Sequence, residues 1–145
     1  MLAYVFWHQR AGDVERDDYE DRLRAFHAKV GVPSACFRLH QLPWKPAEGY
    51  EDWYLVDDWT AVGALNAAAV DAVRRPSHDA AAAGSSHGWG GIYRLVRGDP
   101  EPPAAVRWSH TPESGPDMWQ RQMVLGPAPE YCLVGGEPSG RVRVA

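Results

Sequence analysis

The sequence predicts an α+β fold in which a four-stranded antiparallel sheet carries two helices on one face. Two nearly continuous apolar runs, Leu2–Gln9 (LAYVFWHQ) and Trp53–Val56 (WYLV), are typical of strands that are buried on both faces. Two further segments have apolar residues at helical spacing. The resulting order of strand, helix, strand, strand, helix, strand, with short connections, favours the split βαβ arrangement.

The stretch Tyr50–Trp59 (YEDWYLVDDW) predicts a central strand that leads directly into a helix. Asp57 and Asp58 end the apolar run, and Asp58 or Thr60 can cap the helix by accepting a hydrogen bond from a free N–H group. The helix carries an apolar stripe and should end near Pro76, which cannot continue the hydrogen-bond ladder. A short helical segment is expected at 77–83.

The other predicted elements follow from the same reasoning. An amphipathic helix is expected after Gly12, because apolar residues recur at intervals of four, three and four: Tyr19, Leu23, Phe26 and Val30. Gly31 and Pro33 should stop it. Ala35–Leu42 alternates as a more exposed strand, and Gly91–Val96 supplies the fourth strand.

The 145 residues suit one compact unit, which we divide into a main domain and an extension. Residues 1–98 form the predicted α/β domain. Residues 99–145 form a C-terminal extension containing extra strands, which should pack on the same domain or on a dimer partner. A strand is expected at Val106–His110, and Trp119–Leu125 and Tyr131–Val134 are apolar enough to be ordered. The VRWSH of Val106–His110 is weakly similar to the VFWH of Val5–His8. The similarity indicates the remnant of a second repeat or an extra strand packing on the partner, or it is a coincidence.

The composition excludes several classes of partner. With 15 basic and 19 acidic residues, the net charge of -4 gives no reason to expect nucleic acid or an anionic membrane surface. No run approaches the roughly 20 apolar residues of a membrane span, and no basic flank precedes the first apolar run, so a cytoplasmic location is expected. Cys36 and Cys132 fit no metal spacing and are expected to be buried thiols.

The βαββαβ unit with its WYLVDDW third strand resembles the dimeric α/β-barrel superfamily, which includes EthD-like proteins, antibiotic-biosynthesis monooxygenases and stress-responsive barrel proteins. The resemblance implies a ferredoxin-like sandwich that pairs with a second copy to form a dimeric α/β barrel. A physical argument also favours a homodimer through the sheet face. Two helices cover only one face, and a large exposed apolar patch is rare on a monomer.

A candidate catalytic group lies at one end of the two central strands. If these strands are parallel neighbours, His8 meets Asp57 or Asp58, and a carboxylate beside an imidazole is the usual arrangement of a general base. The alternative is a buried histidine that a capping aspartate satisfies. Candidate substrate-binding residues are aromatic side chains suited to a flat apolar ligand and arginines suited to a carboxylate: Tyr4, Phe6, Trp53, Tyr54, Arg38 and Arg94.

The sequence predicts neither a metal nor a haem cofactor, since none of the six histidines stands at HxH or HExxH spacing. Two classes of function remain open. One is a cofactor-independent monooxygenase, isomerase or cyclase that acts on an aromatic or polyketide-like substrate with His8 as base. The other is a non-catalytic dimeric module that binds a small molecule or a protein.

Overall fold

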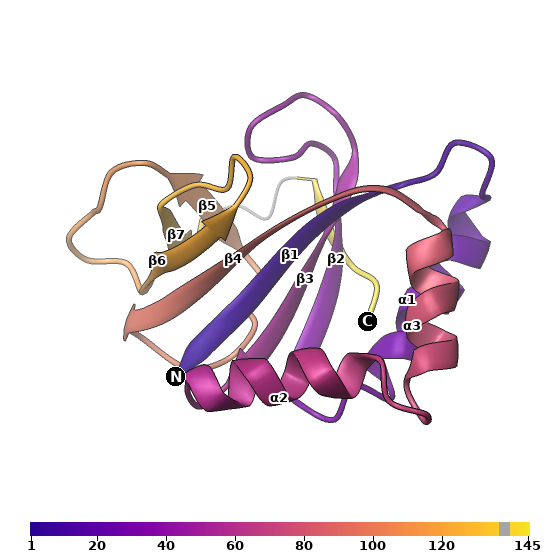
Figure 1. Cartoon of the computed structure of the whole chain (residues 1–145). Helices are drawn as coiled ribbons and strands as arrows, with labels where there is room; N and C mark the ends of the chain where they lie inside the picture. The colour runs from indigo at the N-terminus through magenta and orange to yellow at the C-terminus, as the bar shows by residue number, and fades with distance from the viewer. Residues whose placement is uncertain (137–139) are drawn as a thin grey trace.

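The computed structural model describes residues 1–136 and 140–145, and the chain within these ranges folds into eight strands and three helices (Figure 1). The elements in chain order are β1 (Leu2–Arg10), α1 (Arg16–His27), β2 (Ser34–Leu39), β3 (Gly49–Val56), α2 (Trp59–Ala69), α3 (Arg75–Ala83), β4 (Ser85–Arg97), β5 (Val106–Ser109), β6 (Met118–Leu125), β7 (Tyr131–Val134) and β8 (Arg141–Arg143).

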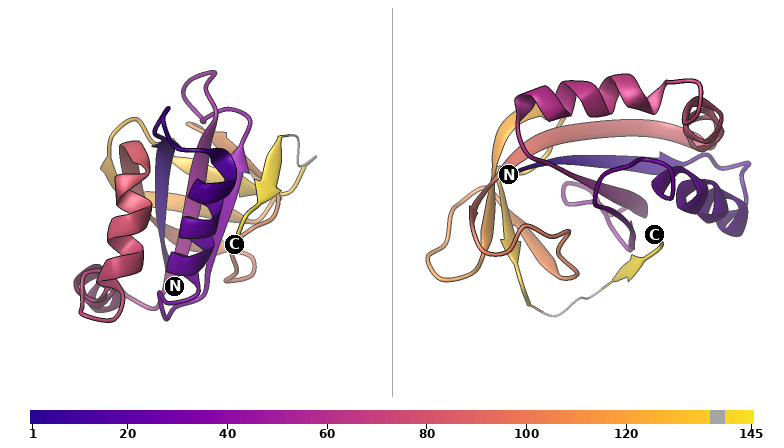
Figure 2. Two further views of the ribbon diagram at one scale, coloured as in Figure 1. Left: turned by 90° about the vertical axis from the view of Figure 1, so that its right-hand side faces the viewer. Right: turned by 90° about the horizontal axis from the view of Figure 1, so that it is seen from below.

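All eight strands belong to one sheet with the order β5-β7-β6-β4-β1-β3-β2-β8. Every pair of neighbours in it is antiparallel. The sheet curls into a half-barrel, with α1 and α3 at one side and β5, β6 and β7 turning away at the other (Figures 1 and 2). The helices are short, at 12, 11 and 9 residues.

The predicted ferredoxin-like α+β sandwich is therefore wrong. The strands after residue 99 do not form an appendage to a four-stranded sheet, because β6 pairs with β4 and β8 pairs with β2, which extends the sheet at both edges. The long β4 makes this possible. It begins at Ser85, whereas the sequence predicted the fourth strand only at Gly91–Val96. The segment Gly88–Gly91 (GWGG) therefore lies inside the strand.

The two faces of the central strands bury different side chains, as the alternation along a strand requires. Tyr4, Phe6 and His8 of β1 lie on the face toward the helices, whereas Val5 and Trp7 lie on the opposite, concave face. In β3, Tyr50, Asp52 and Tyr54 share the helix face. All eight residues of β3 are buried, which confirms the prediction of a strand covered on both sides.

The concave face holds a cluster of tryptophans around a fully buried carboxylate. Glu51 is 0% exposed, and the indole N–H groups of Trp7, Trp53 and Trp108 donate hydrogen bonds to it at 3.0, 2.6 and 2.9 Å. Arg141 of β8 supplies the countercharge, with Nη1 at 2.8 Å from Glu51 Oε1. Trp108 belongs to β5, so this carboxylate joins the curled C-terminal strands to the central sheet.

This cluster gives the second apolar face a cover from the same chain. The homodimer was expected because two helices leave one sheet face bare, and that face is here covered by the side chains of β5, β6 and β7, including Trp108, Trp119 and Cys132. The apolar central strands are thus accounted for within one chain. Pairing with a second copy stays a prediction.

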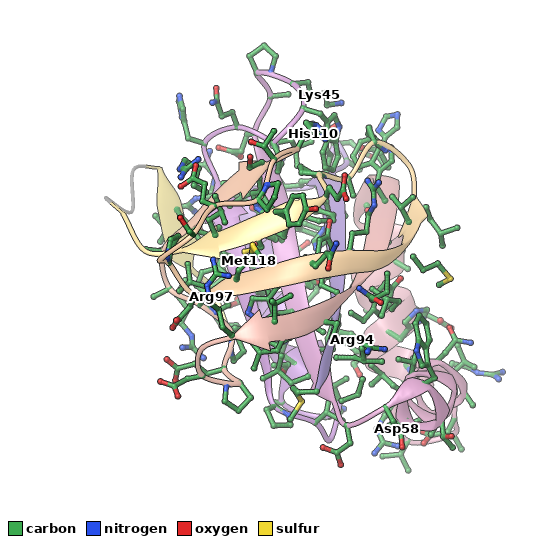
Figure 3. All side chains as sticks on the ribbon, turned by 90° about the vertical axis from the view of Figure 1, so that its left-hand side faces the viewer. Lys45, Asp58, Arg94, Arg97, His110 and Met118 are labelled. Atoms are coloured by element: carbon green, nitrogen blue, oxygen red, sulfur yellow. The ribbon has the colours of Figure 1, made fainter. Side chains whose placement is uncertain are left out.

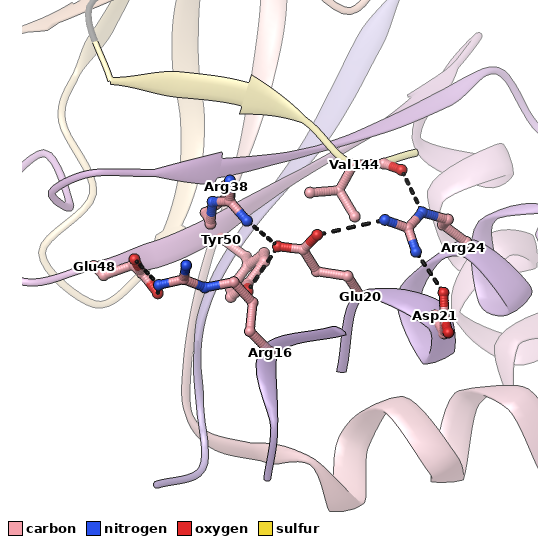
Figure 4. A network of polar contacts seen from close by, with 8 residues as sticks. All are labelled: Arg16, Glu20, Asp21, Arg24, Arg38, Glu48, Tyr50 and Val144. Carbon is pink, nitrogen blue, oxygen red and sulfur yellow. Dashed lines mark hydrogen bonds and ion pairs between the residues drawn. The ribbon is translucent and has the colours of Figure 1, made fainter. Parts of the chain in front are cut away.

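Helix α1 is fixed on the sheet by a network around Glu20 (Figure 4). Its carboxylate accepts hydrogen bonds from Arg38 of β2 at 2.6 Å and from the Tyr50 hydroxyl of β3 at 3.2 Å. Arg24 pairs with Glu20 at 3.4 Å and donates to the Val144 carbonyl at 3.2 Å, which ties the helix to the C-terminal segment. The network holds the inner side of α1 over the central strands.

Both cysteines, Cys36 and Cys132, are free and buried, as predicted. Within residues 1–136 and 140–145, no helix has the length and apolar character that a membrane crossing requires.

Candidate functional site

A cavity of about 190 Å³ lies between the helix face of the sheet and the three helices. Most of its wall is apolar, with aromatic rings from β1 and aliphatic side chains from α1 and α2, among them Tyr4, Phe6, Leu23, Phe26 and Leu65. Exposed Asn66 and part-exposed His78 also line it, so it opens to solvent beside α2 and α3. One part of the wall is polar and is formed by His8, Tyr19, Asp52 and Tyr54.

Glycines in β4 make room for the aromatic side of the cavity. A Cβ atom on Gly88 would lie 2.5 Å from Phe6 Cζ, and one on Gly90 would lie 2.9 Å from Tyr4 Cε2. The two rings therefore lean across β4 where these positions have no side chain. The GWGG segment has a packing role that favours glycine, and it shapes the cavity through Phe6 and Tyr4.

His8 is held by polar contacts at both ring nitrogens and by two neighbouring aromatic rings. Its Nδ1 lies 2.6 Å from the Tyr19 hydroxyl, and its Nε2 lies 3.1 Å from Asp52 Oδ2. The ring also stacks against Phe6 and Tyr50, with centroid distances of 5.7 and 5.5 Å. His8 is only 2% exposed, so the orientation of its ring is fixed by protein groups.

Asp52 is the centre of the polar wall and accepts hydrogen bonds from three side chains. Besides His8, His27 Nε2 lies 3.2 Å from its Oδ1, and the Tyr54 hydroxyl donates to its Oδ2 at 2.9 Å. Burial opposes ionisation of Asp52, but the charges and hydrogen bonds of His8 and His27 outweigh it and hold its pKa well below the usual range. Burial, and then the charge of Asp52, raises the pKa of Tyr54.

The hydrogen-bond partners of the ring nitrogens determine the tautomers of His8 and His27. A carboxylate can only accept, so His8 and His27 each donate their Nε2–H to Asp52. When a ring is neutral, its Nδ1 is then an acceptor, for the Tyr19 hydroxyl at 2.6 Å in His8 and for the Ser34 hydroxyl at 2.9 Å in His27; when a ring is protonated, its Nδ1 is a donor as well. The result is a continuous chain from Tyr19 through His8 to Asp52, which is an arrangement that can relay a proton.

The expected contact between His8 and Asp57 or Asp58 does not occur. β1 and β3 are antiparallel, with His8 opposite Tyr50 and Leu2 opposite Val56, so Asp57 lies near the other end of β1. At about 3.3 Å per residue that separation is roughly 20 Å. Asp58, which Figure 3 labels, instead caps α2. It accepts a hydrogen bond from Ala61 N at 2.9 Å, as its position before the helix predicts.

The predicted substrate-binding residues are divided between several places. Tyr4, Phe6 and Tyr54 line the cavity. Trp53 does not, because it points to the concave face and donates to Glu51. Arg38 is paired with Glu20 at 2.6 Å, outside the cavity lining. Arg94 is exposed on β4 (Figure 3), so neither arginine is positioned to orient a ligand in this cavity.

Sequence reasoning missed Asp52, Tyr19 and His27. A signal was present in Tyr50–Tyr54 (YEDWY), where two adjacent acidic residues lie inside a buried strand. Alternation places these two carboxylates on opposite faces, and each must find partners there because a buried charge is costly when unpaired. Asp52 therefore had to face the same side as Tyr50 and Tyr54.

Three potential metal ligands also meet at the polar wall. The ligand atoms of His8, Cys36 and Asp52 lie within 4.8 Å of one another, and all three residues are buried. Cys36 of β2 is directly opposite Asp52 in the strand register. Burial, and then the charge of Asp52, raises the pKa of the Cys36 thiol.

No family model, no curated protein and no solved structure matches this chain. The resemblance to the dimeric α/β-barrel superfamily accordingly stays a prediction.

Proposed function

We propose that this chain binds a small, mostly apolar molecule with one polar group in the cavity between the sheet and the helices. The observation that carries the proposal is the composition of the cavity wall, which is mostly apolar and has a buried polar part where His8, Tyr19, Asp52 and Tyr54 meet. The other polar residues of the wall are Asn66, His78 and Ser85. Binding sites for small molecules commonly combine an apolar lining with a few convergent polar groups.

The size of the cavity favours a ligand with a single ring. An apolar cavity of roughly 150 Å³ accommodates benzene, and the volume here is about 190 Å³. The polyketide-like substrates expected from the sequence are larger than this. The proposal is therefore restricted to molecules of about the size of phenol, whose ring would contact Phe6 and Leu65 and whose hydroxyl would reach the polar wall.

The proposal can be tested by titrating the purified chain with phenol and following its ring protons by saturation-transfer NMR. We expect saturable binding at one site. Ala69→Trp should abolish it, because Ala69 lines the cavity and an indole there would fill the space. Ala67→Trp is the matched control, since Ala67 is exposed on the same helix and does not line the cavity. Equal binding to both variants, or none to the unmodified chain, would contradict the proposal.

A second candidate function is proton transfer, favoured by the position of His8 between the Tyr19 hydroxyl and the Asp52 carboxylate at 2.6 and 3.1 Å. A carboxylate that holds an imidazole in one tautomer is typical of general-base sites. Both ring nitrogens have protein partners, so a substrate would exchange its proton with Tyr19 or displace that hydroxyl from His8.

The enzymatic candidate can be separated from simple binding with cyclopentanone in D₂O, a single-ring molecule no larger than phenol. Its α-protons exchange for deuterium when a base removes them, and proton NMR follows the exchange. A positioned base typically accelerates such a step by about 10² to 10⁴. His8→Gln should remove the acceleration, whereas His87→Gln should retain it because His87 is exposed and outside the cavity lining. No acceleration by the unmodified chain would contradict the enzymatic candidate and leave the binding proposal intact.

A further inference from the structure

One side chain from each of three adjacent strands contributes to a buried cluster on the helix face. His8 comes from β1, Asp52 from β3 and Cys36 from β2, and their ligand atoms all lie within 4.8 Å of one another. The strand register brings them together. Cys36 of β2 and Phe6 of β1 both lie opposite Asp52, and His8 follows Phe6 by two residues on the same face of β1. Rigid neighbouring strands hold all three.

We propose that His8, Cys36 and Asp52 form a zinc site with an open fourth position toward the cavity. Imidazole, thiolate and carboxylate are the three ligand types that zinc takes from proteins, and three protein ligands with one open position are typical of zinc sites that also bind a small molecule. The thiolate disfavours Mg²⁺ and Ca²⁺, which prefer oxygen ligands. The sequence predicted no metal because this cluster has no recognisable spacing along the chain.

Hydrogen bonds already orient two of the three ligands, His8 and Asp52. His8 Nδ1 is 2.6 Å from the Tyr19 hydroxyl, which leaves Nε2 toward Asp52 and would let Nδ1–H donate to Tyr19 when a metal occupies Nε2. Asp52 is held by the Tyr54 hydroxyl at 2.9 Å and by His27 at 3.2 Å. Ligating histidines and carboxylates in metal sites are usually fixed by outer partners of this kind.

Only a small contraction is needed to reach coordination geometry. Bond lengths of about 2.0 to 2.3 Å in a tetrahedral site place neighbouring ligand atoms roughly 3.3 to 3.6 Å apart. His8 Nε2 and Asp52 Oδ2 are 3.1 Å apart, and no pair in the cluster exceeds 4.8 Å. Binding would therefore separate the histidine and aspartate slightly and draw the cluster inward by roughly 1 Å.

Charge balance and access also suit a divalent ion. A neutral imidazole, a carboxylate and a thiolate carry two negative charges, so a divalent ion makes the buried cluster neutral. Binding releases the Cys36 thiol proton to solvent. His8 and Asp52 both line the cavity, which provides the route for the ion and space for a fourth ligand. The zinc site does not depend on the proposed binding of an organic molecule.

Cobalt(II) is a suitable probe because it substitutes for zinc and reports thiolate coordination through charge-transfer absorption in the near ultraviolet. We expect the full chain, freed of metal with a chelator, to bind one equivalent of Co²⁺ with this band and with the visible bands of tetrahedral cobalt, and Zn²⁺ to displace it. Cys36→Ala should remove the charge-transfer band and weaken Zn²⁺ binding by about tenfold or more.

Cys132→Ala is the matched control, since Cys132 is the other buried cysteine and lies in the concave core. It should keep the cobalt spectrum. Circular dichroism checks that both variants fold, and the cobalt spectrum of the unmodified chain tests the site even if Cys36→Ala does not fold. Absence of the charge-transfer band from the unmodified chain, or its persistence in folded Cys36→Ala, would overturn the zinc site.

The two proposals can fail separately. Phenol binding without cobalt binding would refute the zinc site alone, and cobalt binding without phenol binding would refute the proposed function alone.

Discussion

His8 Nε2 lies 3.1 Å from Asp52 Oδ2, and this contact joins the neighbouring strands β1 and β3 at the polar wall of the cavity. The two residues are 2% and 4% exposed. Neither group can rely on water, so each depends on the other and on the surrounding hydroxyl and imidazole groups. The cavity chemistry and the stability of this sheet face therefore rest on the same side chains.

Asp52→Asn should destabilise the fold. The amide has the shape of the carboxylate, but its NH₂ group would face a donor, so at least one buried donor loses its acceptor. We expect a loss of about 1 to 3 kcal/mol in the free energy of unfolding, measured by urea denaturation. Asp57→Asn is the control, because Asp57 is exposed, and it should change stability by no more than about 0.5 kcal/mol. Equal effects of the two changes would show that Asp52 does not organise the network.

Glu51→Gln should lower the free energy of unfolding more than Asp52→Asn does. Glu51 lies on the other face of β3. The substitution removes the buried ion pair with Arg141. It also places an NH₂ group either against the indoles of Trp7 and Trp108, which share Oε2, or against Trp53 and Arg141, which share Oε1. Breaking a buried pair typically costs about 3 to 5 kcal/mol, which tryptophan fluorescence during denaturation would report.

Glu48→Gln is the matched change for Glu51→Gln. It disrupts a pair with Arg16 in which the arginine and glutamate side chains are 49% and 39% exposed, so it should cost less than about 1 kcal/mol. A mild effect of Glu51→Gln, similar to that of Glu48→Gln, would mean that this carboxylate does not hold the curled C-terminal strands to the sheet.

A pair of glycine substitutions tests how the cavity is shaped. Gly88→Ala places a Cβ atom 2.5 Å from Phe6 Cζ, so the ring must move, and we expect a loss of about 1 to 3 kcal/mol together with weaker phenol binding. Gly63→Ala meets nothing within 4 Å in α2 and should stabilise the chain by up to about 1 kcal/mol. Thermal denaturation distinguishes the two, and stabilisation by Gly88→Ala would contradict the described packing.

The strands themselves could largely be predicted from the sequence because the signals are local. Continuous apolar runs identified β1 and β3, and the stripe of Tyr19, Leu23 and Phe26 identified the buried side of α1. The strands β1 and β3 were predicted to be parallel and are antiparallel, although their direction follows from the order of the elements. A helical crossover returns β2 in the direction of β1, and the β2–β3 connection then reverses β3.

The cover of the concave face could not be predicted in this way. The sequence pattern of an apolar sheet face is the same whether a second copy or a distant part of the same chain covers that face. Here the contact is made by Trp108 and Glu51, which are 57 positions apart. For the same reason the cluster of His8, Cys36 and Asp52 has no signature in the sequence, since it arises from register across three strands.

The two cysteines give a prediction that depends on burial alone. Burial raises the pKa of both thiols, so the reactive thiolate is scarce as well as inaccessible. Ellman's reagent should label neither thiol in the metal-free native chain and should label both in denaturant. Rapid labelling of Cys36 under native conditions would place it at the surface, in conflict with its position between α1 and the sheet.

The central claim is that the cavity beside the His8–Asp52 contact is the ligand site. The most direct test is a carbon-edited NOE spectrum of the labelled chain with phenol, which reports contacts between ligand and protein protons. We expect intermolecular NOEs from the phenol ring to the methyl groups of Leu23 and Leu65, both of which line the cavity. NOEs only to exposed methyl groups such as those of Leu125, or none at saturating phenol, would contradict the claim.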